Sequence, residues 1–309
     1  MCKRKVAVVG AGNVGATTTL RIAESGLANV VLVDIVEGLA KGKALDIWQA
    51  APVQKHDCMV TGTSDYKETE GSDIIVMTGG IARRPGMSRD DLVQTNFQVV
   101  KSCVEEWMKY CPDATVIMVT NPLDVMAYTA YKVSGLPKEK VVGMAGILDT
   151  ARFRAFIAME LNVSVENITA FVLGGHGDDM VPLIRFTNVA GIPLTEFLTK
   201  DKIEDIVART RNGGAEIVKF LQTGSAYYAP AAAVYEMVEA ILLDRNKVVP
   251  CSAYLNGEYG QNDVFAGVPV KLGAKGIREI IKIKLTEDEQ KEFDLSASHV
   301  KEVINTLKF

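Results

Sequence analysis

The chain has 309 residues, 48% of them hydrophobic, and this length exceeds that of a usual single domain, so we expect two domains. Its formal net charge is -4 and its pI about 5.6, with acidic and basic residues interspersed, so it lacks the basic stripe that binds nucleic acid. No apolar run reaches the roughly 18 residues that a membrane span requires, and we therefore expect neither nucleic acid nor a membrane as a partner.

The first half of the chain alternates short apolar runs with segments of helical length. Runs that are apolar on both faces and separated by helices are typical of a parallel sheet with right-handed crossovers. We therefore predict an α/β fold, a Rossmann doubly wound parallel sheet, as a cofactor-binding domain over residues 1–145. The predicted strands are residues 6–9, 30–33, 74–77, 115–119 and 141–144.

The second half, residues 146–309, has longer helical patterns and a hairpin signal, which predicts an α+β domain with antiparallel strands. Asn256-Gly257 is the strongest short hairpin signal, and we expect it to join strands near residues 252–255 and 258–259. Thr286 and Glu289 have capping-box spacing. The predicted helices are residues 150–161, 203–221 and 229–243, with a C-terminal helix interrupted near 294–298 and a further strand at 268–272.

A glycine-rich turn directly follows the first strand. The sequence Gly-Ala-Gly-Asn-Val-Gly at residues 10–15 opens a helical segment, and a second strand ends at Asp34, in the order of a dinucleotide-binding fingerprint. The glycines allow close backbone approach, and the free N–H groups of the helix N-terminus face the pyrophosphate. Asp34 would accept hydrogen bonds from ribose hydroxyls and repel a 2'-phosphate, which predicts NAD rather than NADP. A strand-helix turn that binds another ligand, such as S-adenosylmethionine, is the alternative.

Five cysteines are spread along the chain without a Cys-x-x-Cys pair, and an odd number in this arrangement favours reduced thiols over a disulfide framework or a zinc site. The N-terminus runs directly into the first strand, which leaves no room for a usual signal sequence. We therefore expect a cytoplasmic protein in a reducing compartment. The cysteines are Cys2, Cys58, Cys103, Cys111 and Cys251.

The chain has three histidines, and one of them stands in an unusual context. His176 lies in Gly-Gly-His-Gly-Asp after an apolar run, where flanking glycines favour a side chain displayed at a strand end. A histidine in such a turn is also frequently structural, so both interpretations stay open. His56 and His299 lie in polar surroundings and are expected on the surface.

The sequence Leu-Asp-Thr-Ala-Arg at residues 148–152 lies where the pattern changes from parallel sheet to second domain. Asp149 and Arg152 are three residues apart and share one face of a helix. One interpretation is that Asp149 stabilises the dipole of a helix at its N-terminus and that Arg152 is a surface residue beside it. The other is that Asp149 orients His176 while Arg152 holds a carboxylate through its bidentate fork.

These motifs, with Asn121-Pro122 between them, occur in the order found in the lactate/malate dehydrogenase family, which the chain resembles over its whole length. The resemblance implies hydride transfer between NAD and a 2-hydroxyacid, without a metal. It implies that His176 is the acid/base, that Asp149 is its partner and that Arg152 binds the shared carboxylate. It also implies that Arg89 polarises the reacting carbonyl and that Asn121 contacts nicotinamide or substrate. The cofactor-binding residues implied are Gly10, Gly12, Asn13, Val14, Gly15, Asp34, Thr78, Gly79, Gly80, Asn96, Val119 and Asn121.

A pair of arginines, Arg83-Arg84, places cations on a loop that can close over an anion. In the family, the position matching Arg83 tends to be glutamine for lactate and arginine for malate. Arg83 would neutralise the second carboxylate of malate or oxaloacetate, whereas a bound pyruvate would leave a buried guanidinium unpaired, at a cost of several kcal/mol. The expected substrate is therefore a dicarboxylate, interconverted as (S)-malate and oxaloacetate. Pro85-Gly86 fixes this register, and Arg84 is the alternative selector.

Several alternatives remain beside this hypothesis. A lactate or other 2-hydroxyacid dehydrogenase is disfavoured by Arg83, and a catalytically silent NAD-binding protein finds no support because each acid/base and carboxylate position is filled. A metal-dependent NAD glycosidase has a related nucleotide domain. The family implies a homodimer or homotetramer, and the helical segment 37–50, with Leu39, Ile47 and Trp48, is either a subunit interface or packs on its own sheet.

Overall fold

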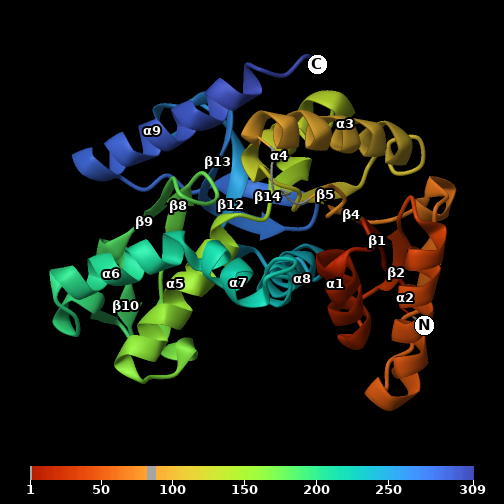
Figure 1. Ribbon diagram of the computed structural model, residues 1–309, viewed down its shortest axis with the longest axis horizontal. Coiled ribbons are helices and arrows are strands. Elements are labelled where there is room, and N and C mark those ends of the chain that lie inside the picture. The colour runs from red at the N-terminus through yellow and green to blue at the C-terminus, as the bar shows by residue number, and fades with distance from the viewer. Residues whose placement is uncertain (1, 82–87) are drawn as a thin grey trace.

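The computed structural model describes residues 2–81 and 88–309 (Figure 1). The first half of the chain forms a parallel sheet in the order β3-β2-β1-β4-β5-β6, which confirms the predicted Rossmann arrangement. Its valines and isoleucines are buried on both faces, as strands covered by helices on both sides require. The strands are β1 (Lys5–Val9), β2 (Asn29–Val33), β3 (Val60–Thr63), β4 (Ile74–Met77), β5 (Thr115–Met118) and β6 (Val141–Gly143).

The predicted strands lie within about one residue of the observed ones, and β3 was missed. Its sequence Val-Thr-Gly-Thr buries only the valine, because β3 is at the edge of the sheet. An edge strand of this kind carries no continuous apolar run. The helices of this half are α1 (Asn13–Glu24), α2 (Glu37–Gln54), α3 (Arg89–Trp107) and α4 (Leu123–Ser134).

The second half adds antiparallel strands, as predicted, and these continue the same sheet. Ser252 pairs with Gly143, so β12 joins β6 and the strands form one sheet of eleven among the described residues. A small separate sheet joins β7, β10 and β11. The added strands are β8 (Val172–Gly174), β9 (Met180–Pro182), β12 (Lys247–Asn256), β13 (Asn262–Gly273) and β14 (Gly276–Ile280), and the small sheet has β7 (Ile168–Thr169), β10 (Asn188–Val189) and β11 (Ile192–Pro193).

The predicted hairpin at Asn256-Gly257 is present, with different bounds. The connection from β12 to β13 contains a 3-10 turn at Glu258–Gly260, so the predicted strand at 258–259 was wrong. Gly257 has φ of +107°, a conformation that favours glycine. The segment 268–272 is the end of β13 rather than a separate strand.

Two helix predictions were wrong in the second half. The segment 203–221 is two helices that meet at Asn212, because the Gly213-Gly214 pair that follows weakens helix continuity. The C-terminal helix is continuous, since Ser296 and Ala297 are buried and hold it against the sheet, and its capping box at Thr286 is confirmed. The helices are α5 (Gly146–Leu161), α6 (Lys200–Arg211), α7 (Gly213–Leu221), α8 (Tyr228–Leu242) and α9 (Glu287–Ile304).

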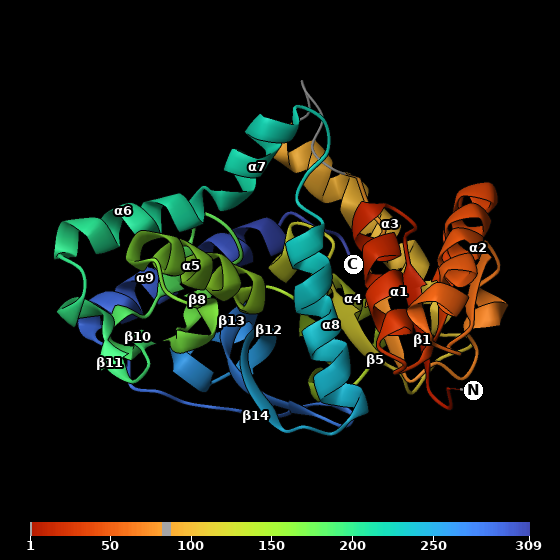
Figure 2. The same ribbon diagram turned by 90° about the horizontal axis from the view of Figure 1, so that it is seen from below.

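The two halves share one apolar core. Trp107 of α3, Met237 of α8 and Phe265 of β13 belong to the same buried cluster. Helix α8 lies alongside α1, as Figure 2 shows, so a helix of the second half packs against the helix that follows the glycine-rich turn. Within residues 2–81 and 88–309, no helix has both the length and the hydropathy to cross a bilayer.

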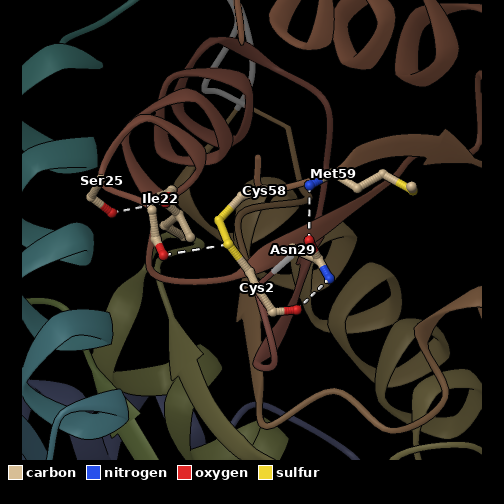
Figure 3. The surroundings of a disulfide bond; sticks show 7 residues. Cys2, Ile22, Ser25, Asn29, Cys58 and Met59 are labelled. Carbon is tan, nitrogen blue, oxygen red and sulfur yellow. Dashed lines mark hydrogen bonds between the residues drawn. A yellow bond between two sulfur atoms is a disulfide. The ribbon is translucent and has the colours of Figure 1, made fainter. Parts of the chain in front are cut away.

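The cysteine prediction was wrong for two of the five residues. Cys2 and Cys58 form a disulfide with a Cα–Cα distance of 5.3 Å, while Cys103, Cys111 and Cys251 are free. The pair is 56 residues apart in sequence, and it comes together because β1 and β3, the strands that follow the two cysteines, both pair with β2. In Figure 3, Asn29 links the same two segments through hydrogen bonds to the Cys2 carbonyl and the Met59 N–H, at 3.0 and 2.8 Å.

We predict that the disulfide raises thermal stability. Closing a loop of this length lowers the conformational entropy of the unfolded chain and raises its free energy by about 4 kcal/mol. The double substitution C2S/C58S should therefore lower Tm by roughly 5–10 °C. Calorimetry with and without reductant checks this, with C103S as a control that keeps the bond. The prediction is wrong if neither reductant nor the double substitution changes Tm.

Candidate active site

The glycine-rich turn between β1 and α1 is packed against the turn after β4. Gly10 has φ of +103°, and a Cβ there would lie 2.6 Å from the Gly79 nitrogen. A Cβ on Gly15 would lie 1.8 Å from the Gly10 carbonyl oxygen, so both positions require glycine for steric reasons. The Thr78 hydroxyl donates to the Gly10 carbonyl at 3.0 Å and holds the two turns together.

Gly12 differs from these glycines, because a Cβ there would meet no protein atom within 4 Å. It caps the N-terminus of α1, and Asn13 and Val14 form the first turn of that helix. Packing therefore does not explain this glycine. The open space in front of helical N–H groups fits a pyrophosphate.

Asp34 lies at the end of β2 next to the same turn. Its carboxylate accepts hydrogen bonds from the Ala11 N–H at 2.7 Å and the Val36 N–H at 2.9 Å. The side chain is half-buried and its direction is fixed by these two contacts. This arrangement fits a carboxylate that binds ribose hydroxyls at the turn.

The turns that end β4 and β5 are joined by side chains. The Thr120 hydroxyl donates to the Gly79 carbonyl at 2.6 Å. The buried Asn96 accepts from the Ile81 N–H at 2.8 Å and donates to the Asn121 carbonyl at 2.7 Å. Asn96 therefore positions two backbone segments. A Cβ on Gly80 would lie 2.6 Å from Thr120, so this glycine also permits close packing.

Further predicted cofactor and substrate positions lie at the end of β5. Val119 is buried at 8% exposure, and Asn121 is exposed immediately before Pro122. The Asn121-Pro122 peptide bond is cis. The exposed Asn121 side chain thus lies at the edge where open α/β sheets bind ligands.

The predicted pairing of His176 with Asp149 is present in the structure. The His176 Nδ1 lies 2.9 Å from the Asp149 Oδ2, and Asp149 is almost fully buried in the first turn of α5. His176 follows β8 within a glycine-containing turn, so two distant segments meet here. The hydrogen bond fixes the orientation of the ring and leaves Nε2 as the nitrogen for proton exchange.

Arg152 lies beside the same carboxylate. Its Nη1 is 3.4 Å from the Asp149 Oδ1, and the side chain is 16% exposed. A Cβ on Gly213 would lie 3.2 Å from the Arg152 Cδ, so the junction of α6 and α7 leaves just enough room for this arginine. The Arg152 Nε is buried with no protein partner among the described residues. A guanidinium with unused donors fits an anion site.

The electrostatic environment favours the protonated form of His176. Burial by itself lowers the pKa of the imidazole, but the Asp149 carboxylate outweighs it and the net pKa is raised. Arg152 opposes this effect and Asp124 adds to it. The pKa of the Arg152 guanidinium is lowered by burial, and Asp149 partly offsets that change.

Sequence reasoning missed three residues that hold the histidine turn. Asp124 accepts from the His176 backbone N–H at 3.0 Å and from the Ser252 hydroxyl at 2.6 Å. The Ser296 hydroxyl accepts from the Gly175 N–H at 2.6 Å. Asp124 lies in the first turn of α4, where an acid ordinarily indicates helix-dipole stabilisation, and the two serines carry no sequence signal.

The remaining predicted residues have different outcomes. Arg83 and Arg84 lie outside the described residues, as does the side chain of Arg89, whose backbone begins α3. His299 is exposed as predicted and lies 3.0 Å from Asp179. The prediction for His56 was wrong, because the ring is 9% exposed and packs against the edge of Trp48 where the chain turns after α2.

The contacts connect the glycine-rich turn to the histidine. The Thr78 hydroxyl contacts Gly10, and the Thr120 hydroxyl contacts Gly79. Helix α4 starts three residues after Thr120, and its Asp124 accepts a hydrogen bond from the His176 N–H. We name His176, Asp149, Arg152 and Asp124 the histidine cluster. A nucleotide turn beside a base and an anion-binding guanidinium supports proton transfer coupled to a redox step. Among the described residues, no three His, Cys, Asp or Glu side chains form a metal site.

Comparisons with known proteins agree with this geometry. Residues 4–143 match the NAD binding domain of the lactate/malate dehydrogenase family, and residues 147–308 match its alpha/beta C-terminal domain. A malate dehydrogenase of Desulforudis audaxviator is 55% identical over 307 residues, covering 99% of each chain.

Solved structures of the same family share this fold over nearly the whole chain. The apo malate dehydrogenase of Picrophilus torridus has a TM-score of 0.96 at 48% identity, covering 98% of this chain and 97% of that one. A lactate dehydrogenase of Cryptosporidium parvum, complexed with lactic acid and nicotinamide adenine dinucleotide, has a TM-score of 0.95 at 42% identity, covering 99% and 98%.

We predict that Asp149→Asn lowers the pKa of His176, because it removes the carboxylate that raises it. In the native protein His176 stays protonated as pH rises past about 6.5, the usual pKa of a histidine side chain. In the variant His176 loses its proton at a lower pH than in the native protein. An NMR titration of the His176 ring measures both values, with His299 as an internal control. An unchanged or higher pKa in the variant contradicts the assignment.

Proposed function

The chain belongs to the lactate/malate dehydrogenase family, and on this basis we propose a role for each residue of its site. It is an NAD-dependent oxidoreductase that interconverts malate and oxaloacetate, as expected from the sequence. The malate dehydrogenases among its relatives favour this function over lactate oxidation.

His176 acts as the acid and base of the reaction. In malate oxidation its Nε2 accepts the proton of the hydroxyl group, and in oxaloacetate reduction it returns that proton. The 2.9 Å contact between His176 Nδ1 and Asp149 is the observation that carries this proposal, because it orients the ring and stabilises the imidazolium.

Arginines bind the substrate and stabilise charge. Arg152 binds the carboxylate next to the reacting carbon through donors that the protein does not use. On the evidence of the sequence, Arg89 polarises the carbonyl oxygen and Arg83 pairs with the distal carboxylate. A protonated His176 and Arg89 together stabilise the negative charge that develops on oxygen during reduction.

The residues of the glycine-rich turn hold NAD. Gly12 leaves room for the pyrophosphate at the N-terminus of α1, and Asp34 binds the ribose. Asn121 contacts the nicotinamide or the substrate from the end of β5. When bound, NAD accepts or supplies the hydride. Asn96 supports this site through the backbone of residues 81 and 121.

We propose a division into a cofactor domain, residues 1–145, and a substrate domain, residues 146–309. The pairing of strands changes from parallel to antiparallel between β6 and β12, and the two family matches meet between residues 143 and 147. The substrate then binds where both meet, with Asp34 on one side and the histidine cluster on the other.

We propose that the protein is a homodimer or homotetramer that associates through α2. This helix exposes apolar side chains that a second copy would bury. Light scattering tests the proposal, and a mass near 33.5 kDa would contradict it. The exposed residues are Leu39, Leu45, Trp48 and Val53.

We propose the cytoplasm as the compartment, on the basis of the three free thiols. The Cys2–Cys58 disulfide does not favour a reducing compartment, because disulfides persist mainly in oxidising compartments and in the cytosol of hyperthermophiles. Alkylation of thiols in intact source cells, followed by fractionation, tests both the location and the state of this pair.

We predict that His176→Asn lowers kcat by about 10²–10⁴-fold while NADH binding stays close to native, because the variant loses proton transfer alone. Steady-state kinetics and fluorescence titration with NADH measure the two effects. His299→Asn is the matched control, since this exposed histidine lies outside the histidine cluster. Near-native turnover of the His176 variant contradicts the proposed role.

We predict that Arg83→Gln lowers kcat/KM for oxaloacetate by roughly 10²–10³-fold, because it removes the charge that pairs with the distal carboxylate. Its preference should shift toward pyruvate. Arg84→Gln is the matched control and should leave the ratio of the two kcat/KM values unchanged. If only Arg84→Gln shifts the ratio, the selector is Arg84.

A further inference from the structure

Asp124 is a buried carboxylate for which the reaction, as derived so far, has no use. It lies in the first turn of α4 and is 4% exposed. Burying an ionised carboxylate costs free energy unless hydrogen bonds and nearby charges compensate for it. Burial, the largest effect, raises the pKa of this carboxyl group above its usual value, and the charge of Asp149 adds to the rise. Hydrogen bonds from Ser252 and from the His176 N–H, and the charge of His176, oppose the rise without cancelling it.

Both carboxylate oxygens of Asp124 accept hydrogen bonds. Oδ2 accepts from the backbone N–H of His176 at 3.0 Å, and Oδ1 accepts from the hydroxyl of Ser252 at 2.6 Å. Ser252 is fully buried on β12. Two donors, one on each oxygen, favour the ionised form of this carboxylate and offset part of the cost of burying it.

The charges of the histidine cluster balance in one protonation state. Asp124 and Asp149 carry two negative charges and Arg152 carries one positive charge, so one negative charge remains when His176 is neutral. Protonation of His176 makes the cluster neutral. Without Asp124, the same protonation would instead create a net positive charge in a buried site.

We propose that Asp124 is a positioning residue for the dehydrogenase reaction, which fixes the backbone of His176 through its N–H group and stabilises the proton that His176 carries. This inference rests on the proposed acid/base role of His176. It assigns to α4, the helix that follows the cofactor-contacting end of β5, a direct effect on proton transfer.

Among the described residues, three charged groups on two helices shift the pKa of the His176 ring. Helix α5 contributes Asp149, which raises the pKa of His176, and Arg152, which lowers it. Helix α4 contributes Asp124, which raises it. Helix α9 supplies the hydroxyl of Ser296, which accepts from the Gly175 N–H at 2.6 Å and has no charge.

Asp124 and Ser296 both hydrogen-bond the backbone of the histidine turn, but only Asp124 carries a charge. Comparing them therefore separates the effect of the charge on His176 from the effect of holding its backbone in place. Asp124→Asn keeps an amide oxygen for the His176 N–H and removes the charge, and its amide N–H can donate to the Ser252 hydroxyl, which reverses the direction of that hydrogen bond. Ser296→Ala removes a neutral hydrogen bond from the adjacent peptide and leaves the charges unchanged. The two variants form a matched pair.

The experiment measures kcat/KM for oxaloacetate with NADH as a function of pH for the native protein and both variants. Reduction requires protonated His176, so kcat/KM falls as pH rises through the pKa of this residue. In Asp124→Asn we expect the midpoint of this fall to lie about 1 pH unit lower than in the native protein. At pH values above the native midpoint, kcat/KM should then be about tenfold lower than in the native protein. In Ser296→Ala we expect kcat or KM to change while the midpoint of the profile stays native.

An Asp124→Asn profile with a native midpoint overturns the inference, as does an equal shift in both variants. If Asp124→Asn fails to fold, Ser252→Ala replaces it, because loss of the hydroxyl donor favours protonation of Asp124 and should move the midpoint in the same direction. An unmoved midpoint in Ser252→Ala then overturns the inference. Failure of the proposed function would appear separately, as near-native turnover of His176→Asn.

Discussion

The site depends on one hydrogen bond, between His176 Nδ1 and Asp149 Oδ2, which joins the turn after β8 to the start of α5. It fixes the ring, raises the pKa of the imidazole against the effect of burial, and leaves Nε2 for the substrate. The same carboxylate lies 3.4 Å from Arg152. Proton transfer and carboxylate binding are therefore held in one geometry by a single buried acid.

Hydrogen bonds between segments that are distant in sequence connect this pair to the glycine-rich turn. Thr78 holds the glycine-rich turn, Thr120 holds the turn after β4, and Asp124 holds the backbone of His176. Each contact joins two strand ends or a strand end and a helix start. Because each strand end is hydrogen-bonded to a neighbour, a continuous series of contacts links the glycine-rich turn to the histidine cluster.

The substrate domain extends the Rossmann sheet. The pairing of Gly143 with Ser252 continues the sheet from β6 into β12, and Ser252 also donates to Asp124. One serine thus takes part both in the sheet and, through Asp124, in the support of the backbone of His176, the proposed acid/base. The junction of α6 and α7 leaves space for Arg152 in a similar way, because a Cβ at Gly213 would lie only 3.2 Å from the Cδ of the arginine that we propose binds the substrate.

The sequence by itself determined the parallel sheet and the glycine-rich turn with Asp34. For His176, Asp149 and Arg152 it left two interpretations open, and the family resemblance implied the pairing that the structure contains. Strand patterns and motif spacing are local, and local patterns survive without knowledge of the fold. It did not reveal Asp124, Ser252 and Ser296, the Cys2–Cys58 disulfide, or the burial of His56. Tertiary structure decided these, since each depends on segments that are distant in sequence and meet only when the sheet is assembled.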